Sequence, residues 1–293
     1  MKRRALLHRA TLAVPAAALP VRRPHGARTR RVVVVGSALT EIAFALGAGG
    51  QVVAVDSTSR FPGAAQHLVQ IGYMRALPPE GIVSLHPDLL LLSSEAGPPD
   101  ALAVLRAARQ RMVVVEDRAG PACVVAKIEA VAKALQCDGR ELAACFAADA
   151  AALDPAIAGA GRPRVLFVLS LSRGAPMVSG RATHAASMLQ WAGAANAIDA
   201  FEGFRPLSAE AALAAAPDLV VMMQHALAEA GGPEALFETP QLRFTPAAAA
   251  RRVIGIDGAY AFGWGPRSAH ARRDLAAAFG AQGLPVLPAR PWV

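Results

Sequence analysis

The stretch "QIGYMRALPPEG" at residues 70–81 carries the groups best suited to chemistry. It holds Tyr73, one of two tyrosines in a chain of 293 residues, followed directly by Met74 and Arg75. In a turn-rich segment of a chain with few aromatic residues, such a phenol can be packing, surface or chemistry. A tyrosine can equally pack its ring and leave its hydroxyl in water, so the rest of the sequence must decide.

Enzyme chemistry has little support in the sequence. Gly36 ends the strand-like run of "VVVVGSALTEI", but Ala38 and Glu41 occupy the other glycine positions of a GxGxxG fingerprint. The backbone therefore lacks the glycines that a dinucleotide site needs, and Glu41 would repel a pyrophosphate. No GxSxG elbow is present either. We expect the protein not to be an enzyme.

The metal-binding residue types are scattered. The seven histidines form no HExxH or HxH motif, although a zinc site built from His67 and His225 stays open as an alternative. Cys123, Cys137 and Cys145 have no CxxC spacing, so a structural zinc site is not indicated.

The positive charge is concentrated at the start of the chain. Residues 1–31 contain nine lysines and arginines and no acidic residue, so removing them from the net charge of +8 leaves the remainder near −1. This distribution argues against nucleic acid as a partner. The basic start followed by the short apolar segment at 10–21 is typical of an export signal, and we predict a leader over residues 1–27 and a periplasmic location.

Alternating patterns along the body predict an α/β fold. Short apolar runs at 31–36, 51–57 and 87–94 read as buried parallel strands, and the segment 37–50 between the first two reads as a helix. Segment 121–160 is helical in composition and offers no strand, after which the alternation resumes. The other predicted elements are helices at 79–85, 99–110 and 183–193, and strands at 112–117, 164–170 and 251–257.

The two halves of the body resemble each other in the order and spacing of their elements. Pro87 lies 55 residues after Val32, and Pro217 lies 52 residues after Val165. We therefore predict two Rossmann-like lobes with parallel central sheets, joined by a long linking helix, with a ligand cleft between them; one continuous doubly wound sheet is the alternative. The predicted divisions are a leader at 1–27, an N-terminal lobe at 31–120, a helical linker at 121–160 and a C-terminal lobe at 161–293.

Four segments carry a family resemblance: "VVGSALTEIAFALGAGGQVVAVDSTSRFP", "VQIGYMRALPPEGIVSLHPDLLLLSSEAGPPDAL", "GAPMVSGRATHAASMLQWAGAANAI" and "AYAFGWGPRSAHARRDLA". Together they resemble the haem-binding periplasmic proteins that deliver haemin to bacterial ABC importers, over about residues 31–285. The GYMR segment is the most specific. The wider class of helix-linked binding proteins also takes siderophores and cobalamin, which remain alternatives to haem.

The resemblance implies a haem site. In that family the tyrosine of the GYMR-like motif supplies the axial oxygen to haem iron, which makes Tyr73 the expected metal ligand and ferric haem b the transported ligand. The family places a cation opposite the tyrosine, in the second lobe, where Arg173 and Arg243 are the candidates. Arg75 would pair with a haem propionate or face solvent. Some members of that family have a histidine near the loop of Arg173 as a sixth ligand. This chain has no histidine between His86 and His184, so the expected iron is five-coordinate, with Tyr73 as its protein ligand.

The resemblance also implies further contacts and partners. Arg181 and Arg267 are expected to be structural, and Glu80 and Glu202 are candidates for docking on the permease. An ABC permease is the expected partner, with an outer-membrane haem receptor involved indirectly, and a rigid linker implies limited lobe closure. Side chains that would line the porphyrin, or else belong to the core, are Met74, Met177, Phe204, Phe244 and Trp264.

Overall fold

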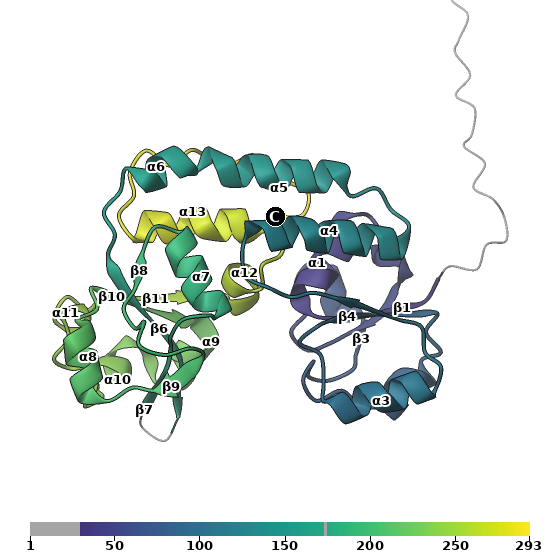
Figure 1. Ribbon diagram of the computed structural model, residues 1–293, viewed down its shortest axis with the longest axis horizontal. Coiled ribbons are helices and arrows are strands. Elements are labelled where there is room, and N and C mark those ends of the chain that lie inside the picture. The colour runs from purple at the N-terminus through teal and green to yellow at the C-terminus, as the bar shows by residue number, and fades with distance from the viewer. Residues whose placement is uncertain (1–29, 173–174) are drawn as a thin grey trace, which may run out of the picture.

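The computed structural model describes residues 30–172 and 175–293. Two α/β lobes stand side by side, and helices run across both lobes along one side (Figure 1). The first lobe contains a five-stranded, wholly parallel sheet of order β3-β2-β1-β4-β5. Its strands are β1 (Val32–Val35), β2 (Val52–Val55), β3 (Val69–Gln70), β4 (Leu89–Ser93) and β5 (Met112–Val115).

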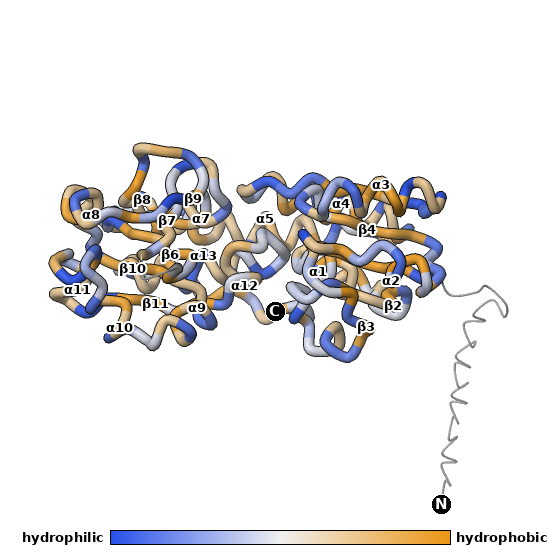
Figure 2. The backbone as a smooth tube through the Cα atoms, turned by 90° about the horizontal axis from the view of Figure 1, so that it is seen from below, coloured by the Kyte–Doolittle hydropathy of each residue, from blue (hydrophilic) through white to orange (hydrophobic). Residues whose placement is uncertain are grey.

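Helices cover this sheet and explain the uninterrupted apolar runs of its strands. Every residue of β1 and β4 is buried, because a parallel sheet with covered faces leaves no strand position facing water. Figure 2 shows hydrophobic residues concentrated in the strands of both lobes. The covering helices are α1 (Ser37–Ala45), α2 (Pro79–Ser84) and α3 (Pro99–Ala107), with short 3-10 turns at Gly49–Gln51 and Gly63–His67.

The second lobe has a six-stranded mixed sheet of order β11-β10-β6-β7-β9, with β8 paired to β6. Its strands are β6 (Arg164–Ser172), β7 (Ala175–Ser179), β8 (Ala195–Asn196), β9 (Phe204–Pro206), β10 (Leu219–Met223) and β11 (Val253–Ile256). Its helices are α7 (His184–Trp191), α8 (Ala209–Ala215), α9 (Gln224–Glu229), α10 (Gly232–Glu238), α11 (Pro246–Ala249), α12 (Gly258–Phe262) and α13 (Ser268–Ala278).

The second sheet differs from the sequence prediction at β7. The two-lobe α/β fold is confirmed, but β7 runs antiparallel to both β6 and β9, where the sequence predicted a parallel sheet. The short segment "APMVS" of β7 contains a proline and has no polar alternation, so it gives no strand signal of its own.

The lobes are linked by a helical hairpin rather than by one long helix. α4 (Pro121–Leu135) packs on α1 of the first lobe, and α5 (Arg140–Ala152) packs on α4 and on α13 of the second. The short α6 (Asp154–Ala158) then leads into β6. A Cβ at Gly139 would lie 2.9 Å from the Ala132 side chain, so the glycine before α5 permits the close approach of the two helices.

A buried ion pair joins the first lobe to the second. Arg267 donates from Nη2 to Oε1 of Glu41 at 2.7 Å and from Nε to Oε2 at 3.1 Å. The two side chains are 13% and 4% exposed, and the guanidinium stacks on the Phe61 ring at 3.6 Å from its centroid. Burial raises the pKa of the Glu41 carboxyl, and the Arg267 hydrogen bond opposes that rise.

A second buried polar cluster joins both lobes to the linker. Lys127 of α4 is 1% exposed, and its ammonium pairs with the Asp117 carboxylate that follows β5. The same Nζ lies 3.4 Å and 3.3 Å from the carbonyl oxygens of Gly263 and Trp264 in the second lobe. His184 of α7 lies 3.3 Å from the Asp117 carbonyl oxygen, which adds a further contact between the lobes.

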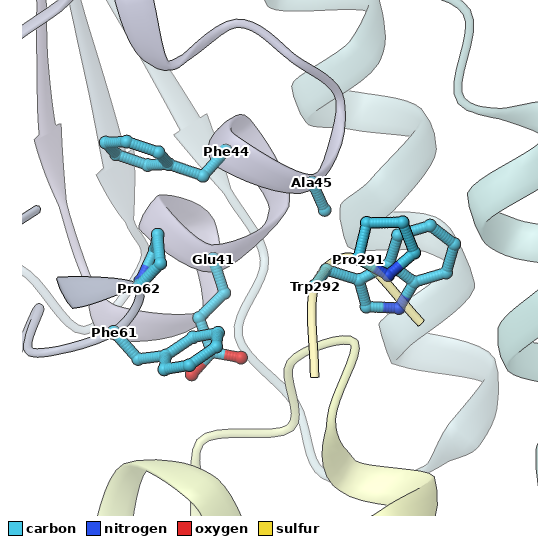
Figure 3. A pocket seen from close by; sticks show the side chains of 7 residues that line it. All are labelled: Glu41, Phe44, Ala45, Phe61, Pro62, Pro291 and Trp292. Carbon is cyan, nitrogen blue, oxygen red and sulfur yellow. The ribbon is translucent and has the colours of Figure 1, made fainter. Parts of the chain in front are cut away.

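The C-terminal segment packs against the linker and against the first lobe. Arg290 pairs with Asp149 of α5 through two hydrogen bonds of 2.7 and 3.1 Å. Trp292 then lines a cavity of about 210 Å³ together with Glu41 and Phe61 of the first lobe (Figure 3). The last residues of the chain therefore pack beside the ion pair that joins the lobes.

Breaking the buried pair should destabilise the protein strongly. We expect Glu41→Ala and Arg267→Ala each to lower the free energy of unfolding by about 3–5 kcal/mol, because each leaves a buried group without its partner. Urea unfolding followed by circular dichroism measures this. Glu234→Ala is the control, since the Arg251–Glu234 pair is exposed and 3.6 Å long, and it should leave the midpoint unchanged. Equal urea midpoints for all three variants would contradict the conclusion that the buried pair stabilises the protein.

Candidate functional site

Three polar side chains of the first lobe follow the carboxyl ends of its strands, at one edge of the sheet. In open parallel sheets this edge is where ligands bind. Tyr73 follows β3, Asp56 follows β2 and Glu95 follows β4. The buried Asp56 carboxylate accepts hydrogen bonds from the Gly36 amide at 2.8 Å and the Thr58 amide at 2.9 Å, which ties neighbouring loops of this edge together.

The backbone around Tyr73 is fixed while its side chain reaches solvent. Tyr73 is 47% exposed. The Gly72 carbonyl accepts a hydrogen bond from the Ser57 amide at 2.8 Å, and Gly72 has φ +90°, a conformation that favours glycine. The Ala76 amide donates to the Tyr73 carbonyl at 2.8 Å and closes a turn. The loop is therefore held against β2 with the tyrosine presented outward.

A second loop supports the first from the side of β4. The Gly97 amide donates to the Met74 carbonyl at 2.9 Å, and the Leu77 amide donates to the Gly97 carbonyl at 2.9 Å. Met74 is half-buried and packs against the apolar core of the first lobe. The loops after β3 and β4 thus form one hydrogen-bonded unit.

Arg75 lies between the tyrosine and an acidic residue. Its Nη1 donates to the Tyr73 hydroxyl oxygen at 3.4 Å, and its Nη2 donates to Oε2 of Glu95 at 2.9 Å. The Glu95 hydrogen bond, more than that of Tyr73, raises the pKa of Arg75. The sequence predicted that Arg75 would pair with a propionate or face solvent and gave no role to Glu95; in the structure Arg75 contacts the phenol, and Glu95 contacts Arg75.

The second-lobe candidates present cationic and aromatic groups at exposed positions. The Arg243 guanidinium lies 4.5 Å from the ring centroid of Phe244, whose side chain is 68% exposed. Phe204 is 41% exposed, and Met177 of β7 is half-buried. Arg173, the other candidate cation, lies outside the described residues. Within the described ranges no hydrogen bond joins Tyr73 to a second-lobe arginine, and the neighbouring cation is Arg75.

The other residues named from the sequence lie in the core or at the surface of the protein. Trp264 is fully buried and packs on Trp191 at 5.2 Å between ring centroids, so it belongs to the core. Arg181 contacts the Asp199 carbonyl and lies 3.7 Å from the exposed Glu202 carboxylate. Glu80 is exposed in the first turn of α2.

The described residues include no cluster of three or more histidine, cysteine or acidic side chains arranged to hold a metal ion, and His67 and His225 join no such cluster there. The three cysteines are free. Over the same residues, no helix combines the length and apolarity that crossing a membrane requires.

Two α/β lobes tied by a helical hairpin define a solute-binding protein of the helix-linked class. A family model described as "Periplasmic binding protein" matches residues 32–260, and the chain belongs to this family. Its members are transport receptors and not enzymes, which confirms the expectation for this chain.

Solved structures of heme-binding members are similar to this chain over most of its length. The periplasmic heme-binding protein BhuT in complex with two hemes is 42% identical, with a TM-score of 0.81, covering 86% of this chain and 99% of that one. RhuT from Roseiflexus sp. RS-1 is 39% identical, with a TM-score of 0.82 and coverages of 86% and 98%. HutB of Vibrio cholerae is 31% identical, with a TM-score of 0.76 and coverages of 86% and 100%.

Curated relatives match over a much shorter stretch. The vitamin B12-binding protein of Vibrio cholerae is 36% identical over 76 residues, which is 26% of this chain. The chain spans 28% of the length of that relative.

Tyr260 should resist ionisation at alkaline pH. Burial and a 2.8 Å hydrogen bond to the Asp274 carboxylate raise the pKa of Tyr260 far above its ordinary range. In a Tyr73→Phe variant, where Tyr260 is the remaining phenol, the absorbance of ionised phenol near 295 nm should therefore rise only at a pH well above that of a free tyrosine. A rise at the pH of a free tyrosine would contradict the burial of Tyr260.

Proposed function

We propose that this protein is a periplasmic carrier that captures ferric haem and delivers it to an ABC permease. The observation that carries the proposal is Tyr73, half exposed on a fixed loop with the Arg75 guanidinium at its hydroxyl. Heme-binding proteins that are 31–42% identical over 86% of the chain support the same ligand.

Tyr73 would ligate the iron as phenolate. Ferric charge favours the anionic form of the oxygen, and the Arg75 guanidinium favours it further. We propose that Tyr73 loses its proton when haem enters and that the proton passes to solvent, to which the side chain is already open. This arrangement needs no arginine from the second lobe to generate the phenolate.

The second lobe would cover the other side of the haem. Phe204, Phe244 and the half-buried Met177 offer apolar surface for a porphyrin, and Arg243 offers a positive charge for a propionate. Arg173 stays a candidate for the same role. The buried Glu41–Arg267 pair favours a largely formed site over a wide hinge motion.

Export and delivery complete the proposal. Residues 1–27 would act as the export leader, since their basic and apolar pattern is that of a signal peptide. The exposed carboxylates of Glu80 on the first lobe and Glu202 on the second would contact the permease, although Glu202 already lies beside Arg181. An outer-membrane receptor would supply haem upstream.

Cobalamin is the second candidate ligand. The partial match to vitamin B12-binding proteins favours it, but that match covers about a quarter of either chain. Excess cyanocobalamin should leave haemin binding unchanged if haem is the ligand, whereas competition between the two would favour cobalamin.

Haemin titration of the ligand-free protein tests the proposal. We expect a saturable Soret band together with a ferric-phenolate charge-transfer band. Tyr73→Phe should abolish the charge-transfer band and weaken binding at least ~10-fold, a loss of about 1.4 kcal/mol. The titration should also give the stoichiometry, since BhuT is described with two hemes.

Tyr260→Phe is the matched control for this titration. It removes the only other tyrosine, which hydrogen-bonds to Asp274, and should leave both bands in place. The proposal fails if the two variants behave alike, or if the unmodified protein shows no saturable haemin binding.

A further inference from the structure

We propose that the cavity beside the junction of the lobes binds a small neutral aromatic molecule that carries an N–H or O–H donor. Among the residues that the structure describes, the lining of this cavity includes none from the loops that carry Tyr73 and Glu95. The site is therefore separate from the proposed haem site, and the experiment that tests it uses no haem.

Three segments that are far apart in the sequence line the cavity, namely α1, the loop after β2 and the C-terminal segment (Figure 3). The apolar side chains that they contribute are Phe44, Ala45, Phe61, Pro62, Pro291 and Trp292. Three of these side chains are aromatic and two are proline rings. Such flat apolar surfaces suit stacked or edge-on contacts with another ring.

The first-lobe side of the cavity is fixed without a ligand. The Phe61 ring stacks on the Arg267 guanidinium, 3.6 Å from the ring centroid. A Cβ at Gly49 would lie 2.6 Å from the Phe44 ring, so this glycine leaves the space that the ring occupies. A ligand would therefore meet aromatic surfaces that are already in position, which lowers the entropy that binding costs.

The C-terminal side of the cavity is anchored to the linker. Arg290 pairs with Asp149 of α5 through two hydrogen bonds, and the Val293 amide donates to the Arg290 carbonyl oxygen at 3.1 Å. Leu287, earlier in the same segment, is buried in the core. Trp292 thus lies in a turn that is held at its first residue. A ligand in the cavity would contact the first lobe and this anchored segment together.

The charged side chain of the lining, Glu41, determines which charge the ligand can carry. Both of its carboxylate oxygens accept hydrogen bonds from Arg267, so the pair has no net charge. A cationic ligand would approach the Arg267 guanidinium, and an anionic one would approach the Glu41 carboxylate. Either would leave water for a site without a free counter-charge, which is costly. The cavity therefore favours a neutral molecule.

Glu41 can accept one more hydrogen bond. A carboxylate has about four lone-pair sites, and over residues 30–172 and 175–293 the donors to this carboxylate are the two nitrogens of Arg267. An N–H or O–H group on the ligand would use a remaining site. Because the acceptor is ionised, such a bond is stronger than one between neutral groups.

The volume of the cavity limits the ligand to one ring or two fused rings. An apolar cavity of ~150 Å³ takes benzene, and pockets for drug-sized ligands begin near ~300 Å³. The cavity here, at about 210 Å³, lies between these values. Indole has two fused rings and one N–H donor, so it is a suitable probe, whereas a porphyrin is too large.

Saturation-transfer difference NMR with indole tests the proposal on the ligand-free protein. The signal should saturate as indole is added. Benzofuran has the same shape as indole but an oxygen in place of the N–H, so it cannot donate to Glu41. We expect it to bind at least ~10-fold more weakly than indole, because hydrogen bonds to charged groups contribute about that much.

Ala45→Phe locates the bound indole. The added ring would occupy space in the cavity and should weaken indole binding at least ~10-fold, a loss of about 1.4 kcal/mol. Ala147→Phe is the matched control, because Ala147 lines a separate cavity on the linker helices, and it should leave indole binding unchanged. Trp292→Ala removes one side of the cavity without altering a helix and should also weaken binding. Circular dichroism confirms that each variant is folded.

Four results would overturn the proposal. They are the absence of saturable indole binding, equal affinities for indole and benzofuran, an unchanged indole affinity in Ala45→Phe or Trp292→Ala, and an equal loss in Ala45→Phe and Ala147→Phe. The last result would place the bound indole outside the cavity. None of these results depends on whether the protein binds haemin.

Discussion

The buried contacts between the two lobes constrain everything else in this molecule. Glu41 and Arg267 pair across the junction, and Lys127 of the linker reaches Asp117 of the first lobe and the carbonyls of Gly263 and Trp264 in the second. Such charges are costly to bury and still more costly to separate, because each would be left without a partner in an apolar setting. The lobes are therefore held at a set spacing, and the proposed ligand would meet a surface that already exists.

The candidate site depends on local order in one loop. The cation next to the Tyr73 hydroxyl is Arg75, which comes from the same loop as the tyrosine. The loops after β3 and β4 are bonded to each other through Met74 and Gly97, and the Asp117 carboxylate connects them to the junction. The loop that carries Tyr73 and the junction between the lobes thus share one hydrogen-bonded support.

Much of the fold could be predicted from the sequence because its strands are short apolar runs and its halves repeat. The strand β7 could not, since its pairing with β6 and β9 is set by tertiary packing and its sequence has no alternation. Tyr73 could be named from its motif, and Arg75 from its position beside it. Glu95 could not, because it stands 20 residues from Arg75 and meets it only when two loops fold together. The burial of Lys127 could not be predicted either, because its contacts with Asp117, Gly263 and Trp264 come from distant parts of the chain.

The central claim is that the Tyr73 oxygen binds the iron of ferric haem. Resonance Raman spectroscopy of the haemin complex, prepared with ring-deuterated tyrosine, tests this most directly because the chain has only two tyrosines. The account predicts phenolate modes that are enhanced by excitation in the charge-transfer band, shift with the isotope and persist in Tyr260→Phe. A haemin complex whose spectrum shows no isotope-sensitive phenolate modes would contradict it.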